Sequence, residues 1–158
     1  MKNTILFFAL AVLMVFTQNS NAQFWQQTNG PGGDNTQSVA VAPNGTIFVA
    51  SRALHRSTDD GKTWQRILQD IPIWYIQKVV AQPSGAIIVF VNPYYQDIPN
   101  TLLRSTDNGD SWTKLPIDCN YYGVAISGLW SSGAGKLFAF DDSKLMLSTD
   151  DGVQSCLF

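Results

Sequence analysis

Acid–base chemistry in this 158-residue chain would have to rest on aspartate, because all twelve acidic residues are Asp and no Glu occurs. Two carboxyl groups at a suitable separation are what glycoside hydrolysis requires. Four aspartates outside the repeated motif described below are the candidates for such a pair: Asp34, Asp70, Asp97 and Asp118. Asp141 and Asp142 fall in a predicted tight turn, where we expect them to be solvated. Turn or surface roles are the structural alternative for all six.

Other residue types that carry chemistry are scarce. His55 has no partner histidine, so we expect a packed or surface residue. One His and two Cys exclude a site built from several such ligands, and we expect no metal and no cofactor. The two thiols, Cys119 and Cys156, could form a disulfide in an oxidising compartment, but sequence alone does not supply the geometry. We expect both thiols to be free and partly buried.

The overall composition favours a folded protein made of short strands and many turns. Hydrophobic residues make up 45% of the chain, charged residues only 14%, and there are 12 Gly and 7 Pro. An average soluble domain has about 25% charged residues. The formal net charge of −2 provides no positive surface for a phosphate backbone, so we expect no nucleic-acid partner.

The first 22 residues have the pattern of a signal peptide. Lys2 precedes an apolar run from Thr4 to Phe16, and small residues at Ser20 and Ala22 suit a peptidase site before Gln23. The run is shorter than the ~20 residues that a membrane span needs. We therefore predict cleavage after residue 22, no membrane span in the mature chain, and a secreted, periplasmic or cell-surface location; an uncleaved anchor is the alternative.

The rest of the chain repeats an octapeptide. Ser57–Trp64 (STDDGKTW) recurs as Ser105–Trp112 (STDNGDSW), and a third copy begins at Ser148–Gly152 (STDDG) before it departs. The central glycines are 48 and 43 residues apart. This period matches a four-stranded propeller blade.

Each copy of the octapeptide ends a series of predicted strands. The runs are short, rich in Val, Ile, Phe and Thr, and separated by glycine turns, which is the pattern of antiparallel hairpins. The predicted strands are 38–42, 46–51 and 54–58 in the first unit, 78–82, 86–91 and 102–106 in the second, and 123–130, 136–140 and 144–149 in the third.

Every residue type in the octapeptide has a structural use in a hairpin. Glycine adopts a positive φ at little steric cost. The first aspartate can accept backbone N–H groups across the turn, and the Ser and Thr hydroxyls can complete that network. The tryptophan that starts the returning strand can bury a large apolar area.

These residues resemble the Asp-box, or bacterial neuraminidase repeat, of the sialidase-like β-propeller superfamily. The resemblance covers roughly residues 24–152 and implies an architecture shared by many functions. It also implies a structural box on the outer rim, away from catalysis. The box residues that it assigns are Ser57, Asp59, Gly61, Trp64, Ser105, Asp107, Gly109, Trp112, Ser148, Asp150 and Gly152. In the third copy Gln154 and Ser155 stand where the motif has Thr and Trp.

The resemblance gives no catalytic residue. Sialidase-type relatives use a tyrosine paired with a glutamate, together with an arginine triad, and this chain has no glutamate. Its strand and hairpin arginines show no triad motif: Arg52, Arg56, Arg66 and Arg104. A xyloglucanase-like relative with two aspartates is not excluded by composition.

We predict an all-β fold, an incomplete β-propeller of about three four-stranded blades. The predicted parts are an outer closing strand at 24–29, blades at 38–68 and 76–116, and a partial blade at 123–158. Closed propellers have about four to eight blades. We therefore infer a fragment of a larger propeller. The alternative is a short protein whose open blade edges associate with missing blades or with another chain.

Strand parity places three aromatic pairs on the face opposite the boxes. They are the candidate binding face, Trp74, Tyr75, Tyr94, Tyr95, Tyr121 and Tyr122. Such side chains suit stacking on sugars or contact with protein, and packing between blades is the structural alternative. The predicted function is a secreted, non-catalytic binding or scaffold module for a glycan or an extracellular protein. The alternatives are a fragment of a glycoside hydrolase with catalytic residues beyond the C-terminus and a non-functional truncated product.

Overall fold

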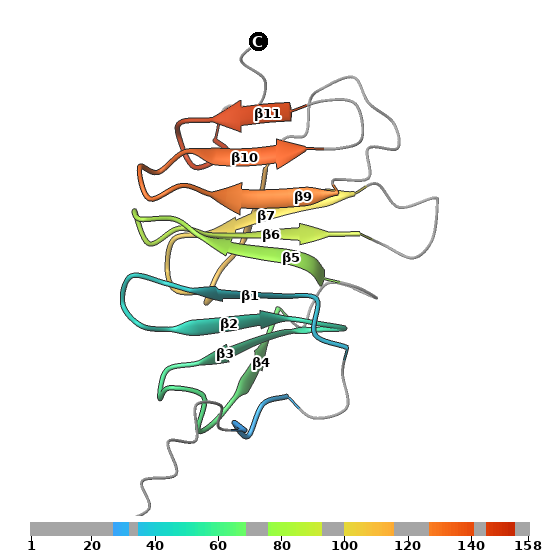
Figure 1. Cartoon of the computed structure of the whole chain (residues 1–158), viewed down its shortest axis with the longest axis vertical. Coiled ribbons are helices and arrows are strands. Elements are labelled where there is room, and N and C mark those ends of the chain that lie inside the picture. The colour runs from blue at the N-terminus through green and yellow to red at the C-terminus, as the bar shows by residue number, and fades with distance from the viewer. Residues whose placement is uncertain are drawn as a thin grey trace, which may run out of the picture.

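The computed structural model describes residues 27–31, 35–68, 76–92, 100–115, 127–140 and 145–153. These residues form three antiparallel sheets, which are stacked one after another along the long axis of the molecule (Figure 1). The predicted signal peptide at 1–22 lies outside the described residues. None of the described residues forms a helix long and apolar enough to cross a membrane.

The strands of each sheet follow one another in chain order. The first sheet contains β1 (Ser38–Val41), β2 (Ile47–Ala50), β3 (Leu54–Ser57) and β4 (Gln65–Ile67). The second contains β5 (Ile76–Ala81), β6 (Ile87–Val91), β7 (Thr101–Ser105) and β8 (Thr113–Leu115). The third contains β9 (Gly128–Ser131), β10 (Leu137–Phe140) and β11 (Leu145–Ser148).

The register of the three sheets is the same, which makes their positions equivalent. The first residue of the second strand pairs with the box serine in every sheet: Ile47 with Ser57, Ile87 with Ser105 and Leu137 with Ser148. This arrangement confirms the predicted all-β fold class, in which similar antiparallel sheets succeed one another along the chain.

Glycine turns set this register at the start of each second strand. In the first sheet the Gly45 amide donates to the Ala42 carbonyl at 2.9 Å, and Gly45 has a φ of 85°. The Asn44 side chain then accepts the Thr46 amide at 3.0 Å. A type I turn followed by a left-handed glycine is a common hairpin connection because its geometry suits the twist of the strands.

The burial of each strand depends on its neighbours. All five residues of β6 are buried, because the second sheet has another sheet on each of its faces. In β1, by contrast, Val39 and Val41 are exposed and alternate with half-buried residues. A continuous apolar run therefore marks a strand covered on both faces.

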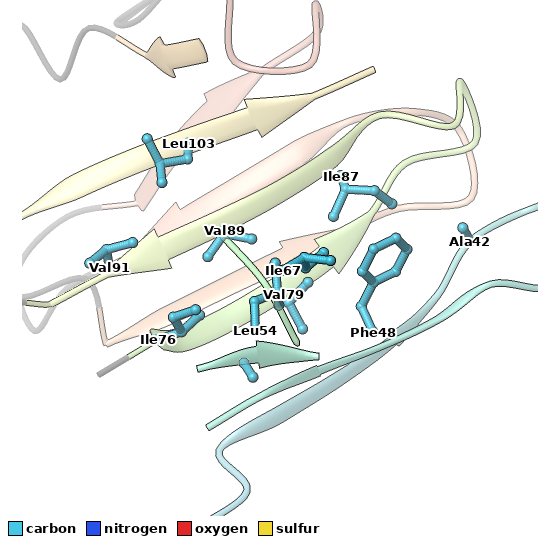
Figure 2. Close-up of a cluster of buried hydrophobic side chains, with 11 residues drawn as sticks. Ala42, Phe48, Leu54, Ile67, Ile76, Val79, Ile87, Val89, Val91 and Leu103 are labelled. Atoms are coloured by element: carbon cyan, nitrogen blue, oxygen red, sulfur yellow. The ribbon is translucent and has the colours of Figure 1, made fainter. Parts of the chain in front are cut away.

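Two clusters of apolar side chains hold the sheets together. Between the first and second sheets, Phe48 and Leu54 lie against side chains of the second sheet such as Val89 (Figure 2). Between the second and third sheets, Phe90 packs with Leu137 and its neighbours. Burial of such side chains is the main favourable term in the stability of the stack.

The first strands of the sheets contact one another along the stack, β1 with β5 and β5 with β9 (Figure 1). The Ser38 hydroxyl bridges β1 and β5, because it donates to the Val79 carbonyl and accepts the Val79 amide, both at 3.2 Å. The Ile76 amide donates to the Ser51 carbonyl at 3.0 Å. These bonds fix the first two sheets relative to each other.

Candidate functional site

The first box forms a closed hydrogen-bond network around one aspartate. Asp59 Oδ1 accepts the Ser57 hydroxyl at 2.8 Å and the Thr63 amide at 2.9 Å, and Asp59 Oδ2 accepts the Thr63 hydroxyl at 2.6 Å. The Gly61 amide donates to Ser57 Oγ at 2.9 Å. The carboxylate therefore joins both arms of the β3–β4 hairpin.

Two successive left-handed residues form the tip of each box. The φ values are 58° and 80° at Asp60 and Gly61, and the Lys62 amide donates to the Asp59 carbonyl at 3.3 Å. Asn108 and Asp151 repeat the positive φ before the glycines of the other two boxes. This is the dihedral pattern of a type I′ turn, for which Asp-Gly and Asn-Gly are the preferred pairs.

The box tryptophan closes the hairpin over its glycine. Trp64 Nε1 donates to the Gly61 carbonyl at 3.1 Å, and Trp112 makes the same bond to Gly109 at 3.1 Å. Both tryptophans are half-buried and immediately precede β4 and β8. Their rings therefore pack along the hairpin while the indole N–H is satisfied locally.

The other two boxes repeat the serine and aspartate contacts. In the second, Asp107 accepts the hydroxyls of Ser105 and Ser111 and the Ser111 amide. In the third, the Ser148 hydroxyl donates to Asp150 Oδ1 at 2.7 Å and accepts the Gly152 amide at 2.8 Å. Gln154 and Ser155, at the positions of the threonine and the tryptophan, lie outside the described residues.

These hydrogen bonds hold the box carboxylates in the ionised state. The hydroxyl and amide of Thr63, followed by the Ser57 hydroxyl, lower the pKa of Asp59 from 3.8 to about 2. The corresponding groups of Ser111 and Ser105 hold the pKa of Asp107 well below its usual range. A general acid must carry a proton near the working pH. Asp59 and Asp107 are therefore suited to building the hairpin and not to protonating a leaving group.

Each box glycine packs against the preceding part of the repeat. A Cβ added to Gly109 would lie 2.8 Å from Ile67 Cδ1 of β4, and one added to Gly152 would lie 2.8 Å from Leu115 Cδ1 of β8. At Gly61 the neighbour is Thr28, whose Cγ2 would lie 3.5 Å away. The glycines thus permit a close approach to the outer strand of the preceding sheet at Gly109 and Gly152, and to the segment around Thr28 at Gly61.

An arginine of the first sheet ties that sheet to the second box. Arg56 Nη1 donates to the Asn108 carbonyl and to Asp110 Oδ1, each at 2.7 Å. Asn44 adds a side-chain hydrogen bond to Asn108 at 3.3 Å. We call these polar contacts between a sheet and the next box the seam.

The second sheet makes an equivalent seam with the third box. Arg104 Nη2 lies 3.7 Å from Asp151 Oδ2, and the Ser84 hydroxyl donates to the same oxygen at 2.8 Å. Arg56 and Arg104 directly precede their box serines, and Asn44 and Ser84 occupy the same turn position. The seam is therefore part of the repeat, although the acidic residue moves from one box position to another.

The seam residues were not identified from the sequence. Arg56 and Asp110 are 54 residues apart, so their contact depends on how the sheets stack. The sequence signal that could have found them is the arginine before the box serine, which occurs in the first two copies. A comparison of the three boxes would also have found the left-handed residue that precedes each glycine, because this position is Asp or Asn in every box.

Most of the remaining predicted functional residues lie outside the described part of the chain. These are the six residues of the candidate binding face, Trp74, Tyr75, Tyr94, Tyr95, Tyr121 and Tyr122, the aspartates Asp34, Asp70, Asp97, Asp118, Asp141 and Asp142, and the thiols of Cys119 and Cys156. His55 is half-buried on β3. Within the described residues, the predicted site is therefore represented by the boxes and the seam, and the contacts of both stabilise the fold.

The strand ends define two opposite faces of the stack. The boxes and the turns between first and second strands lie at one end of the strands, as the pairs Val41–Ile47 and Arg56–Gln65 show. The segment 92–100 joins the other end, because Val91 pairs with Thr101. The segments after β4 and β8 also leave from that end. All three segments that contain the aromatic pairs are thus attached opposite the boxes.

No protein-family model matches the chain, and no curated protein matches it by sequence. Solved β-propeller structures do match. One is the GH74 enzyme of Niastella koreensis, with 25% identity over 77% of this chain and a TM-score of 0.56. Another is YCF48 from Cyanidioschyzon merolae, with 16% identity over 84% and a TM-score of 0.61. YCF48 bound to D1 peptide matches with 18% identity over 78% and a TM-score of 0.53.

These structural neighbours are Asp-box-like β-propellers, and the chain matches only part of each. It spans 17% of the GH74 enzyme and 39% and 40% of the two YCF48 chains. The fold shown by the comparison is thus a set of successive propeller blades.

Proposed function

We propose that this chain is part of a secreted propeller that binds a glycan or an extracellular protein through the face opposite the boxes. The observation that carries the proposal is the strand topology. The boxes lie at one end of the strands, and the described strands that flank the other segments end on the opposite side. We infer that the residues of those segments, Trp74 and Tyr75, Tyr94 and Tyr95, and Tyr121 and Tyr122, gather on that side.

The box face is the less suitable binding surface. The carboxylates of Asp59 and Asp107 are occupied by hydrogen bonds within each hairpin, and Arg56 and Arg104 contact the next box. Polar groups that are already paired inside the protein have little capacity left for a partner. In this proposal the opposite face carries the six aromatic residues, which supply contact area at a small entropic cost.

The fold is compatible with such a partner. YCF48, which shares the fold, is solved in complex with the D1 peptide. The predicted signal peptide at 1–22 agrees with an extracellular partner, because it would direct the chain out of the cytoplasm.

Replacement of Tyr94 and Tyr95 by alanine tests the proposal. The full chain and the double variant are applied to a glycan array and to a peptide array, and the melting temperature of each is measured. We expect the wild-type chain to bind one class of probe, and the variant to lose that binding with an unchanged melting temperature.

A matched control lies on the opposite face. Thr58 and Thr106 are exposed box residues, so T58A/T106A removes two surface side chains without touching the aromatic segments. This control should bind like the wild type. If Y94A/Y95A binds normally, or unfolds at a lower temperature, the two tyrosines serve packing and the proposal is wrong.

A second candidate function, a fragment of a glycoside hydrolase, is favoured by the 25% identity to the GH74 enzyme. Hydrolysis requires two facing carboxylates, and in this candidate they lie in blades that follow residue 158. Reading the coding sequence past that residue in all frames tests this. Further boxes together with aspartates outside them would support hydrolysis, and a continuation without them would exclude it.

A further inference from the structure

The third sheet has an apolar face that none of the other described residues covers. Its side chains come from all three strands: Trp130, Phe138, Phe140 and Leu145. We call this the outer face. Trp130 is 59% exposed and Leu145 62% exposed, and the rings of Trp130 and Phe138 contact each other with centroids 5.6 Å apart.

The outer face occupies positions that are covered in the second sheet. By register, Trp130, Phe138, Phe140 and Leu145 are equivalent to Val80, Ile88, Phe90 and Leu102. In the second sheet these positions pack against the third sheet. The outer face therefore has the composition and the position of a surface that binds another sheet.

The other end of the stack has the complementary surface. On the first sheet Val39, Val41, Ile47 and Val49 are equivalent to Val79, Ala81, Ile87 and Val89, which face the first sheet from the second. We call this the free face. Val39 is 57% exposed and Val41 61% exposed at the β1 side of this face, whereas Ile47 is half-buried and Val49 is buried. The stack therefore ends in two unlike apolar surfaces, and exposed apolar patches of this kind mark interaction sites.

The seam positions of the third sheet are uncharged. The third sheet has Leu147 where the other sheets have Arg56 and Arg104, and Ala134 where they have Asn44 and Ser84. The first box has Lys62 where the second has Asp110. The first box also has Asp60 where the third has Asp151, so its two charged side chains at these positions are of opposite sign. The uncharged Leu147 and Ala134 would therefore meet a box tip without net charge, and the contact involves no repulsion between like charges.

The segment before the first sheet supplies a further match. Thr28 lies against Gly61 as Ile67 lies against Gly109 and Leu115 against Gly152. Thr28 thus takes the place of an outer-strand residue of a preceding sheet. Among the described residues the third sheet has three strands, with β11 at its edge. A sheet docked in front of the first sheet would place its β11 next to the segment around Thr28.

We propose that two copies of this chain associate head to tail, with the outer face of each packed on the free face of the other. Two such contacts close a ring of six sheets, and the segment around Thr28 of each copy lies beside β11 of its partner. An interface between unlike surfaces gives a ring when the rotation closes. Six blades fall within the range of about four to eight found in propellers. The inference is independent of which ligand the aromatic face binds.

The test is the mass in solution of the full chain, expressed with its own N-terminal segment and measured by light scattering after size exclusion. We expect the mass of two chains for the wild type. W130D on the outer face and V39D on the free face should each give the mass of one chain. T106D, at an exposed box residue, is the matched control and should remain a pair of chains.

Mixing the two variants distinguishes a head-to-tail contact from a symmetric one. A mixture of W130D and V39D retains one intact outer face and one intact free face, so it should recover the mass of two chains. Far-UV circular dichroism and thermal melting establish that each variant is folded, and L145D replaces W130D if that variant fails to fold.

Three results would overturn the proposal. A wild-type chain that stays single at its highest soluble concentration shows that the faces do not bind a second copy, and leaves further blades of a longer chain as their occupant. V39D that remains a pair, while W130D does not, shows that two outer faces bind each other. A continuous series of larger species shows that the contact does not close.

Discussion

Phe90 and Phe140 occupy the same position in two consecutive repeats but have different surroundings. Phe90 is fully buried, at 0% exposure, because the third sheet covers it, whereas Phe140 is 42% exposed on the outer face. The residue type and the strand register are identical. The difference shows that burial in this fold is decided by the neighbouring sheet, and that the third repeat has kept the apolar surface without such a neighbour among the described residues.

The polar contacts differ between the repeats in the opposite way. Arg56 and Arg104 reach the next box, but the third repeat has Leu147 at that position. Its outer face is therefore less polar than the covered faces that it resembles. The predictions that follow test this contrast between the covered face of the second sheet and the outer face of the third.

The largest effect is expected from truncating the covered phenylalanine. F90A should lower the free energy of unfolding by about 3–5 kcal/mol, because it leaves a cavity between two sheets. F140A should change that of the single chain by less than about 1 kcal/mol, since the ring is already partly in water. Urea unfolding of both variants measures the difference. Similar decreases in the free energy of unfolding would mean that Phe140 is as well packed as Phe90 and would contradict the contrast between the two faces.

The next effect concerns the glycines of the covered and open regions. G109A should lower the free energy of unfolding by about 1–3 kcal/mol, because Gly109 has a left-handed φ of 92° and the added Cβ would crowd the Ile67 side chain. Gly45 also has a positive φ, but no atom lies near the Cβ that an alanine would add. G45A should therefore lower the free energy of unfolding by about 1–2 kcal/mol, through the backbone conformation alone. The difference in urea midpoint between the two variants isolates the close approach of box and outer strand. Equal midpoints would show that Ile67 moves away freely.

The seam gives a smaller effect. R56A should lower the free energy of unfolding by about 1 kcal/mol, because the Arg56 guanidinium donates to the Asn108 carbonyl and to the largely exposed Asp110 carboxylate. R104A should cost about 0.5 kcal/mol or less, since its charge pair is longer. A double-mutant cycle of Arg56 with Asp110 separates the ion pair from the carbonyl contact. A coupling as large as the whole loss would contradict the role given to the Asn108 carbonyl.

The boxes also differ from the outer face in their response to acid. The pKa of Asp59 is about 2 in the folded chain against an ordinary value of 3.8. Its stabilising contribution is therefore complete above the ordinary value and is lost as the pH falls toward the folded pKa. The urea midpoint of the wild type should decrease between about pH 4 and pH 2, and D59N should decrease less steeply. W130F, on the outer face, should follow the wild-type pH profile; a D59N profile parallel to both would exclude the box as a source of the dependence.

Much of the fold could be predicted because its signals are local. The apolar run Ile87–Val91 follows a glycine turn, and the same order of glycine turn and apolar run recurs at Ile47 and Leu137. The hairpin network around Asp59 could also be anticipated, since its hydrogen bonds join residues at most four positions apart. Local chemistry of this kind is readable from the residue types alone.

The contacts that join the sheets could not be predicted in the same way. The bond between Arg56 and the second box requires the stacking angle of two sheets, which no short stretch of sequence encodes. Thr28 shows the same limit, because the polar residue gives no sign that it would lie against Gly61. The role of the aromatic pairs stays a prediction, since all six residues fall outside the described ranges.

The outer strands β4 and β8 are only three residues long, and Arg66 and Lys114 are exposed on them. Short, charged margins are poor templates for cross-β polymerisation. The β4 and β8 edges thus offer little opportunity for another chain to add sideways, whereas docking on the broad faces of the sheets stays possible.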